Sequence, residues 1–503
     1  MIRFENDQGP PTLLKQFQEK CEAFSIRNCR ANETRPFAMT SSSILSADKI
    51  RSNFSAAMSA MYRDEVPAYG TLMSLVASVN DETLAADAHL KTRLEATDTL
   101  DRISEERHGA IRLGTRQELS MMRRVFAVMG MHPVGYYDLS TAGVPVHSTA
   151  FRPVGAESLS RNPFRVFTSL LRLDLIADET LRQEAADVLA ARKIFTDEAV
   201  ALVEKAERDG GLDAANAARF VAQVLETFRW HDHAIVSADM YKRLHDAHRL
   251  IADVVSFKGP HINHLTPRTL DIDKIQARMP QEGIAPKAIV EGPPTRNCPI
   301  LLRQTSFKAL EEAVSFIAAD GTWQAGSHSA RFGEIEQRGV ALTPKGRALY
   351  DTLLNDTRAR VRPAADGSNA SEYEAALADV FKAFPDTWDG IRKAGLGYFS
   401  YSLTEKGMSV SGRRADLETA IEAGLIQFDP IVYEDFLPVS AAGIFQSNLG
   451  DDAAQDFVAS PNQMMFERDL GATVLDEFAH YAGIQRASLE MCLGIVNMAA
   501  AAE

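Results

Sequence analysis

The first clear pattern along the chain is helical and begins near residue 46. Between residues 46 and about 105, apolar residues recur at steps of three and four, the spacing that gathers them on one face of an α-helix. Ser46 stands just before this stretch, and its side chain suits a helix N-cap. We therefore expect the folded part of the chain to open with helices.

The pattern changes from helical to strand-like at residue 106. Residues 106–114 have the character of a strand, 116–129 that of a helix, and two further strands are expected at 134–139 and 144–152. The chain is thus predicted to pass from a strand through a helix to further strands before residue 170.

A long helical stretch, rich in Ala, Glu, Leu and Arg, follows at about 176–255. Beyond it we expect strand character at 254–257 and 264–266, a helix at 273–279, strands at 288–291 and 299–307, a helix from 307 to 317, and a strand at 330–342. This second set roughly repeats the first. The stretch at 176–255 is therefore predicted to be a helical insertion between two similar sets, and residues 346–503 to be mixed and mainly helical.

The N-terminal residues have a different character. Residues 1–38 mix prolines, charges and small polar residues, and we expect a flexible N-terminal extension there, with Met39 as the functional start. Residues 39–503 are predicted to form a single elaborated domain.

Composition narrows the class of protein. Hydrophobic residues make up 45% and charged residues 24%, which is typical of a globular protein, and the net charge of -14 argues against a nucleic-acid partner. No apolar run approaches the roughly 18 residues that favour a membrane span, and the N-terminus lacks a signal-peptide pattern. The four cysteines have no metal-type spacing. We expect a cytoplasmic protein with reduced thiols and no membrane partner.

The strand at 330–342 carries an unusual row of charges. Side chains alternate along a strand, so Glu334, Glu336 and Arg338 are predicted to share one face. Burying such a row of charges on a packed face costs free energy unless a metal ion or an anion binds to it. A solvated face with a Glu–Arg pair is the alternative.

A histidine and an arginine share a face of the strand near residue 110. His108 opens that strand, and Arg112 lies four residues on, hence on the same side. An imidazole that binds a metal and a guanidinium that binds a carboxylate would together suit an anion that also coordinates the metal. A face packed on acidic neighbours is the alternative.

The segment from Gly259 to Arg268 places two histidines beside two prolines. His261 and His264 are an odd number of residues apart, so both cannot point the same way from a regular strand. We expect His264, which heads the strand, to be the ligand and His261 to have a structural role.

These residues together make a set of two histidines and one carboxylate: His108, His264 and either Glu334 or Glu336. Three protein ligands leave open positions for a substrate and O2, as in non-haem Fe(II) oxygenases. Zinc with a bound water fits the same ligands. Spacing alone leaves both metals open.

Long motifs of the chain resemble one known family. The sequences at 108–112, 259–268 and 332–339 are similar to those of the 2-oxoadipate dioxygenase/decarboxylase family, within the vicinal-oxygen-chelate superfamily. The resemblance runs from about residue 46 to the C-terminus. It implies an α+β fold in which paired βαβββ modules form a half-open barrel around one metal, elaborated with helices.

The resemblance also implies a reaction and a site. The family converts 2-oxoadipate and O2 to D-2-hydroxyglutarate and CO2, a step in lysine catabolism. Carried over to this sequence, His108, His264 and Glu334, with Glu336 as the alternative, would bind Fe(II). Arg112 would bind a carboxylate of the 2-oxo dicarboxylic acid, and Val439 and Ser440 would help to hold it.

Two other functions remain open at this point. A zinc-dependent isomerase, lyase or hydrolase could use the same scaffold, and an iron dioxygenase could act on another 2-oxo acid. Arg112 favours an acidic substrate without measuring the length of its chain.

Overall fold

The computed structural model describes residues 43–96, 100–307, 310–318, 320–364, 366–409, 416–437 and 461–498. The predicted extension at residues 1–38 lies outside them. Among the described residues, no helix is both long and apolar enough to cross a bilayer.

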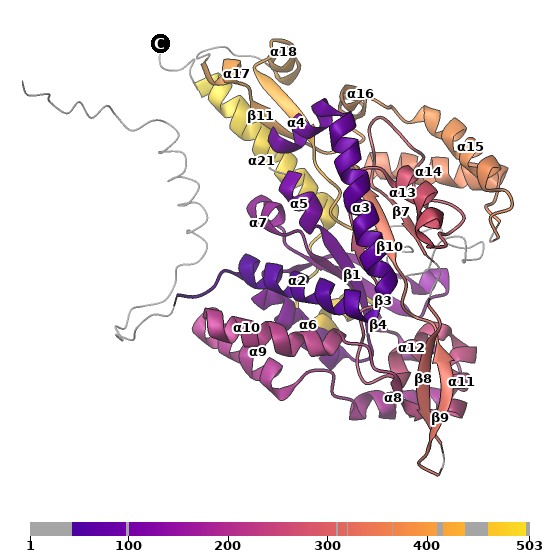
Figure 1. The fold of residues 1–503 in the computed structure, drawn as a ribbon. Helices are drawn as coiled ribbons and strands as arrows, with labels where there is room; N and C mark the ends of the chain where they lie inside the picture. The colour runs from indigo at the N-terminus through magenta and orange to yellow at the C-terminus, as the bar shows by residue number, and fades with distance from the viewer. Residues whose placement is uncertain are drawn as a thin grey trace, which may run out of the picture. The chain divides into compact units, whose positions relative to one another are not determined.

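The first set of elements runs in the order strand, helix, strand, strand, strand, and its four strands form one sheet (Figure 1). β4 pairs parallel with β1 and antiparallel with β3, and β3 pairs with β2, so the spatial order is β2-β3-β4-β1. The helix begins at a capping box in which Thr115 and Glu118 bond to each other's backbone. These elements are β1 (Arg107–Leu113), α6 (Arg116–Val128), β2 (His132–Asp138), β3 (Val146–Arg152) and β4 (Arg165–Leu171).

A second set repeats this connectivity. β10 pairs antiparallel with β7, Arg268 bridges Glu336 in parallel, and Glu291 bridges Gln304 antiparallel. The spatial order is therefore β6, β10, β7 and the segment at Glu291, which matches β1, β4, β3 and β2 of the first set. The elements are β6 (Leu265–Pro267), α13 (Ile272–Arg278), β7 (Leu302–Ser306) and β10 (Glu334–Arg338).

The two sets join through β1 and β6, which pair antiparallel. No ladder among the described strands connects β2 back to the far edge at β7 and the segment at Glu291, so the arrangement is open. The prediction of an α+β fold built from paired βαβββ modules is confirmed, with the second module's second strand reduced to an isolated bridge at Glu291.

Two predicted elements are wrong. Residues 312–317 form a strand, β8 (Glu312–Ile317), where we expected a helix, because Val314 and Phe316 are buried at a period of two and β8 pairs with β5 and β9. Residues 254–256 belong to a helix, α12 (Arg249–Ser256), where we expected a strand. Every residue of α12 except Arg249 is buried, and a helix buried on all sides has the same apolar run as an interior strand.

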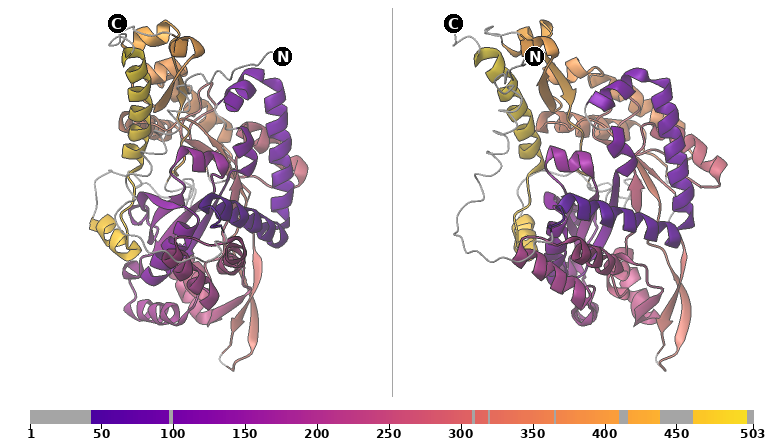
Figure 2. Two further views of the ribbon diagram at one scale, coloured as in Figure 1. Left: turned by 90° about the vertical axis from the view of Figure 1, so that its left-hand side faces the viewer. Right: turned by 60° about the vertical axis from the view of Figure 1, so that its left-hand side comes forward.

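Further helices and small sheets lie among the other described residues. The long N-terminal helix α2 packs the Phe54 ring edge-on against Phe164 and Phe228, and the C-terminal helix α21 lies alongside β11 (Figure 2). The remaining helices are α2 (Ala47–Glu65), α3 (Pro67–Ala86), α4 (Ala88–Ala96), α5 (Leu100–Glu105), α7 (Ala156–Arg161), α8 (Glu179–Ala191), α9 (Asp197–Asp209), α10 (Ala214–Leu225), α11 (Ala238–Ala247), α14 (Pro344–Arg360), α15 (Ala370–Val380), α16 (Trp388–Lys393), α17 (Glu405–Ser409), α18 (Leu417–Glu422), α20 (Pro461–Leu470) and α21 (Glu477–Met498). The remaining strands are β5 (His233–Ser237), β9 (Trp323–His328), β11 (Phe399–Leu403) and β12 (Ile426–Pro430), and short 3₁₀ turns lie at Ser140–Ala142, Leu173–Leu175, Glu226–Phe228, Met279–Glu282 and Phe381–Ala383.

The first turn of α21 docks through buried polar groups. The Tyr137 hydroxyl donates to Oε2 of Glu477 at 3.3 Å, and the Tyr481 hydroxyl donates to Oδ2 of Asp435 at 2.6 Å. Burial, reinforced by the nearby negative charge of Asp435, raises the pKa of Glu477 to about 8. The folded protein therefore holds a proton on Glu477 at neutral pH.

This proton makes stability depend on pH in a defined direction. The folded state binds a proton that the unfolded state releases above its ordinary pKa, so the free energy of unfolding should fall as pH rises from about 4.5 to about 8, by up to about 1.4 kcal/mol per pH unit. Glu477→Gln mimics the neutral acid and should remove this part of the slope, as measured by urea unfolding at pH 5 and pH 8. Glu179→Gln, at a side chain that is 84% exposed, is the control. An unchanged slope in Glu477→Gln would contradict the assignment.

Candidate metal centre

Three side chains predicted from the sequence meet where the two modules join. His108 lies on β1, His264 immediately precedes β6, and Glu334 begins β10. Nε2 of His108 is 3.0 Å from Oε2 of Glu334, and Nε2 of His264 is 3.6 Å from the same oxygen. One ligand atom from each residue lies within 4.8 Å of the other two, and all three residues are buried. We call these three residues the metal cluster.

The polar atoms of this cluster suit a cation. Nδ1 and Nε2 of His264 and Oε1 of Glu334 are buried and have no hydrogen-bond partner among the described residues. Unpaired buried polar atoms are costly, and a metal ion bound to one nitrogen of His264 and to Glu334 would remove part of that cost. Burial also lowers the pKa of His264 to about 4, which keeps its imidazole neutral, as coordination requires.

The two carboxylates beside His108 favour a positive charge. Burial lowers the pKa of His108, but the attraction of Glu336 and the hydrogen bonds of Glu334 and Glu336 outweigh it and raise the pKa. Oε2 of Glu334 also accepts a hydrogen bond from the Thr266 hydroxyl at 2.9 Å. The cluster therefore attracts cations, and its residues could hold a metal.

The structure distinguishes the two glutamates that the sequence left as alternatives. Glu336 forms a double ion pair with Arg338, with Oε1–Nε and Oε2–Nη2 distances of 2.7 and 2.9 Å. Burial raises the pKa of Glu336, but Arg338 and His108 outweigh it and lower the pKa to about 2. Oε2 of Glu336 lies 3.1 Å from Nδ1 of His108. This geometry suits Glu336 for orienting the ring whose Nε2 faces the cluster, the usual role of a carboxylate behind a ligating histidine.

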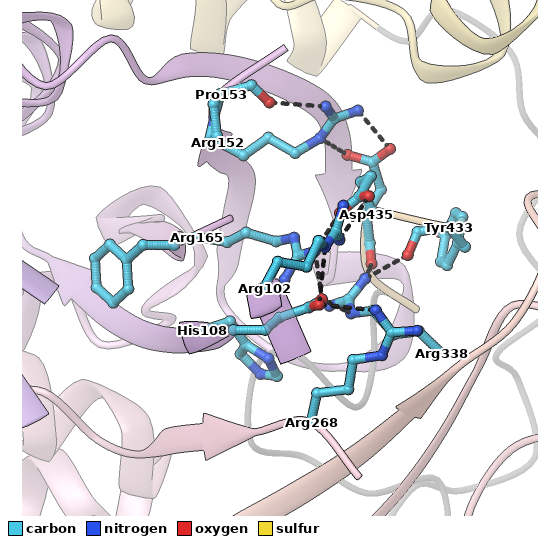
Figure 3. A network of polar contacts seen from close by, with 12 residues as sticks. Arg102, His108, Arg152, Pro153, Arg165, Arg268, Arg338, Tyr433 and Asp435 are labelled. Atoms are coloured by element: carbon cyan, nitrogen blue, oxygen red, sulfur yellow. Dashed lines mark hydrogen bonds and ion pairs between the residues drawn. The ribbon is translucent and has the colours of Figure 1, made fainter. Parts of the chain in front are cut away.

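A buried network of charged side chains adjoins these residues (Figure 3). It was not predicted from the sequence. Its centre is Glu106, which precedes β1 and accepts from Arg165 at 2.7 Å and from Arg268 at 2.8 Å. Glu434 pairs with Arg102 and with Arg165, and both glutamates are almost wholly buried. Burial raises the pKa of Glu106, but the surrounding arginines outweigh it and hold the pKa well below its ordinary value. The charges therefore remain ionised inside the protein and join β1, β4, β6 and the segment at Glu434.

The other predicted site residues divide into three groups. Arg112 follows His108 on β1, and its Nη1 lies 2.6 Å from Oδ2 of Asp253 on α12. His261 lies away from the metal cluster and contacts Asp253 instead. Val439 and Ser440 lie outside the described residues.

Asp253, His328 and Glu106 were not predicted from the sequence as site residues. Glu106, directly before the His108 strand, could have been suspected as a buried charge. Asp253 lies in the predicted helical insertion, next to the strand expected at 254–257, and His328 lies in a segment for which no element or site was predicted.

The fold and the cluster together place this molecule among α+β proteins that can hold one metal ion between two βαβββ modules. A model of the 2-oxoadipate dioxygenase/decarboxylase family matches residues 54–448, and the chain belongs to this family. The resemblance seen in its motifs is thereby confirmed.

The sequences of several relatives align with this chain over nearly their whole length. The 2-oxoadipate dioxygenase/decarboxylase of Pseudomonas putida is 57% identical over 463 residues, which are 92% of this chain and 99% of that protein. The protein of the same name from Escherichia coli is 54% identical over 89% of this chain and 98% of that protein. The crystal structure of the hydroxyglutarate synthase from Pseudomonas putida in complex with 2-oxoadipate is 56% identical, with a TM-score of 0.83, over 90% of this chain and 99% of that one.

The different contacts of the two glutamates give a test. Glu334→Gln should abolish stoichiometric metal binding, whereas Glu336→Gln should weaken it about 10- to 100-fold, because it removes an orienting carboxylate and leaves the three cluster residues in place. Metal content after dialysis and titration with Fe(II) under argon would measure both.

The double variant Glu336→Gln/Arg338→Met controls for the loss of the carboxylate that pairs with Arg338 through two hydrogen bonds. Full loss of metal in Glu336→Gln together with retention in Glu334→Gln would reverse the two assignments.

Proposed function

We propose that this protein is an Fe(II)-dependent dioxygenase/decarboxylase that converts 2-oxoadipate and O2 to D-2-hydroxyglutarate and CO2, a step in lysine catabolism. The observation that carries the proposal is the buried metal cluster of His108, His264 and Glu334, in a chain 57% identical to an enzyme named for this reaction. The related structure named for its complex with 2-oxoadipate supports the same substrate.

The metal would be held by His108, His264 and Glu334. When bound, Fe(II) supplies open positions for a 2-oxo acid and O2 and the electrons that activate O2. The protein would supply two imidazoles and a carboxylate, and it would hold the His108 ring in place through Glu336.

Arg112 would recognise the far end of the substrate. It lies on the same face of β1 as His108, four residues away, which is about 13 Å of strand. A guanidinium binds a carboxylate through two parallel hydrogen bonds, so it would hold a dicarboxylic acid by the end remote from the metal. With one end held, the reacting carbon is presented in one position.

Aromatic rings close the site to bulk water. The Phe436 ring packs edge-on against His108, with ring centres 4.9 Å apart, and the Phe332 ring lies 4.7 Å from His264. Both phenylalanines are buried. Excluding water strengthens the charge interactions inside and limits side reactions of the activated oxygen. We keep Val439 and Ser440, which follow Phe436 closely in sequence, as further substrate contacts in this proposal.

The reaction itself is the first test. Protein loaded with Fe(II) under argon and then given 2-oxoadipate and air should consume one O2 for each CO2 and each 2-hydroxyglutarate formed, with the product resolved by chiral chromatography. The zinc-loaded protein should consume no oxygen, because zinc is redox-inert. Oxygen uptake with other 2-oxo acids but none with 2-oxoadipate would overturn the substrate assignment.

Replacement of the arginine tests how the substrate is held. Arg112→Met should lower kcat/KM for 2-oxoadipate by about 100-fold or more, since it removes a charged hydrogen-bonding partner, while the bound iron stays at the level of the unmodified protein. Arg116→Met, at an exposed position on α6, is the matched control and should leave both unchanged. Loss of iron in Arg112→Met would assign the residue to the metal cluster instead.

A further inference from the structure

A second buried cluster of polar side chains contacts Arg112, and neither the sequence motifs nor the proposed reaction accounts for it. Its centre is Asp253 on α12. Oδ2 of Asp253 lies 2.6 Å from Nη1 of Arg112, while Oδ1 lies 2.9 Å from Nε2 of His328 and 3.2 Å from Nε2 of His261. All of Asp253, His261 and His328 are buried.

The hydrogen bonds of this cluster define its protonation. Burial raises the pKa of Asp253, but His261 and Arg112 outweigh it and hold the pKa well below its ordinary value, so its oxygens only accept. Nε2 of His328 therefore donates to Asp253. In the neutral form of the His328 ring, Nδ1 then accepts from the Tyr241 hydroxyl, 2.8 Å away. A chain of hydrogen bonds thus runs from Tyr241 through His328 and Asp253 to Arg112.

Asp253, His261 and His328 also have the composition of a metal site, but their contacts differ from those of the metal cluster. Oδ1 of Asp253 is already at hydrogen-bonding distance from Nε2 of His261 and from Nε2 of His328. Nη1 of Arg112 lies 2.6 Å from the other oxygen of the same carboxylate. In the metal cluster, by contrast, both nitrogens of His264 and one oxygen of Glu334 lack partners among the described residues. The second cluster is therefore better suited to hold a guanidinium than a divalent ion.

The surroundings keep this cluster rigid. The Trp230 ring packs edge-on against His261, with ring centres 4.6 Å apart, and the Phe257 ring lies 4.7 Å from that of His328. In such an apolar cage the hydrogen bonds to Asp253 are stronger than in water. Asp253 is thus fixed on one side before any substrate binds.

A second group restrains the same nitrogen of Arg112. With its amide oriented to satisfy both contacts, Asn263 accepts from Nη1 of Arg112 at 2.9 Å and donates to the Ala110 carbonyl at 3.3 Å. The backbone N–H of Asn263 also donates to the Ala110 carbonyl, at 3.0 Å. Two acceptors on one nitrogen set the plane of the whole guanidinium, because its nitrogens are coplanar.

We propose that Asp253, buttressed by His261 and His328, is the positioning residue for Arg112 and so determines the preference for 2-oxo dicarboxylic acids over 2-oxo monocarboxylic acids. The inference rests on the proposed function of Arg112. An arginine side chain has many rotamers, and fixing one of them before the substrate arrives removes an entropic cost from binding. Asp253 acts through Arg112 and does not touch the metal cluster.

Two ligands that differ by one carboxylate separate this role from a merely structural one. The iron-loaded protein would be titrated under argon with 2-oxoadipate and with 2-oxohexanoate, which has the same six carbons but no distal carboxylate. Asp253→Asn should raise the Kd of 2-oxoadipate about 10- to 50-fold and change the Kd of 2-oxohexanoate less than about two-fold. Isothermal titration calorimetry measures both without turnover.

Two further variants complete the test. Asp273→Asn breaks an aspartate–arginine pair elsewhere, where Oδ2 and Oδ1 of Asp273 lie 2.7 and 2.9 Å from Nη1 and Nη2 of Arg303, and should leave both constants unchanged. Tyr241→Phe removes the last member of the chain and should weaken 2-oxoadipate binding in the same direction by a smaller factor. It decides the matter if Asp253→Asn fails to fold.

Each outcome is distinct. An equal rise in the Kd of both ligands, or no change in either Kd, would overturn the role of Asp253 while leaving the proposed function intact. If the unmodified protein binds the two ligands equally well, the function proposed for Arg112 falls, and the role of Asp253 falls with it.

Discussion

The short antiparallel pairing of β1 with β6 is the contact on which the rest of the site depends. Three residue pairs make it, and they bring His108 of the first module beside His264 of the second. Gly109 allows this approach, because a Cβ at that position would lie 2.6 Å from Cδ1 of Ile262 and 3.2 Å from the carbonyl oxygen of His264. A side chain on Gly109 would therefore press on the segment that carries one of the three cluster residues.

The price of this arrangement is a large amount of buried charge. Removing one partner from a buried ion pair commonly costs about 3–5 kcal/mol, because the other charge stays desolvated. Here Glu106 pairs with Arg102, Arg165, Arg268 and Arg338. Glu434 pairs with Arg102 and Arg165, and Glu336 with Arg338 and His108, so each carboxylate has more than one partner. The network thus connects strands of both modules and, through Glu336, fixes the orientation of His108.

A similar arrangement recurs four residues further along β1. His108 lies against Glu336 and Arg112 against Asp253, so both side chains of β1 contact a buried carboxylate. The two carboxylates come from β10 and from α12, elements that follow β1 at very different distances along the chain. The carboxylate that contacts Arg112 therefore comes from the last helix of the predicted insertion.

Local patterns in the sequence predicted much of the fold and of the candidate site. Alternation along β1 put His108 and Arg112 on one face, the repeated order of elements indicated two similar modules, and the motifs at 108–112, 259–268 and 332–339 identified the family. Local patterns misjudged 254–256, because a fully buried helix and an interior strand have similar apolar runs. They also misjudged 312–317, where only Val314 and Phe316 are buried and pairing with β5 and β9 defines the strand. The sequence alone also could not separate Glu334 from Glu336, which share a strand face and a residue type. The tertiary structure separates them, since Arg338 pairs with Glu336 while His264 and Thr266 face Glu334. Partners such as Asp253 and Glu106 could be found only in space, because charge pairing acts through distance and leaves no periodic signal along the chain.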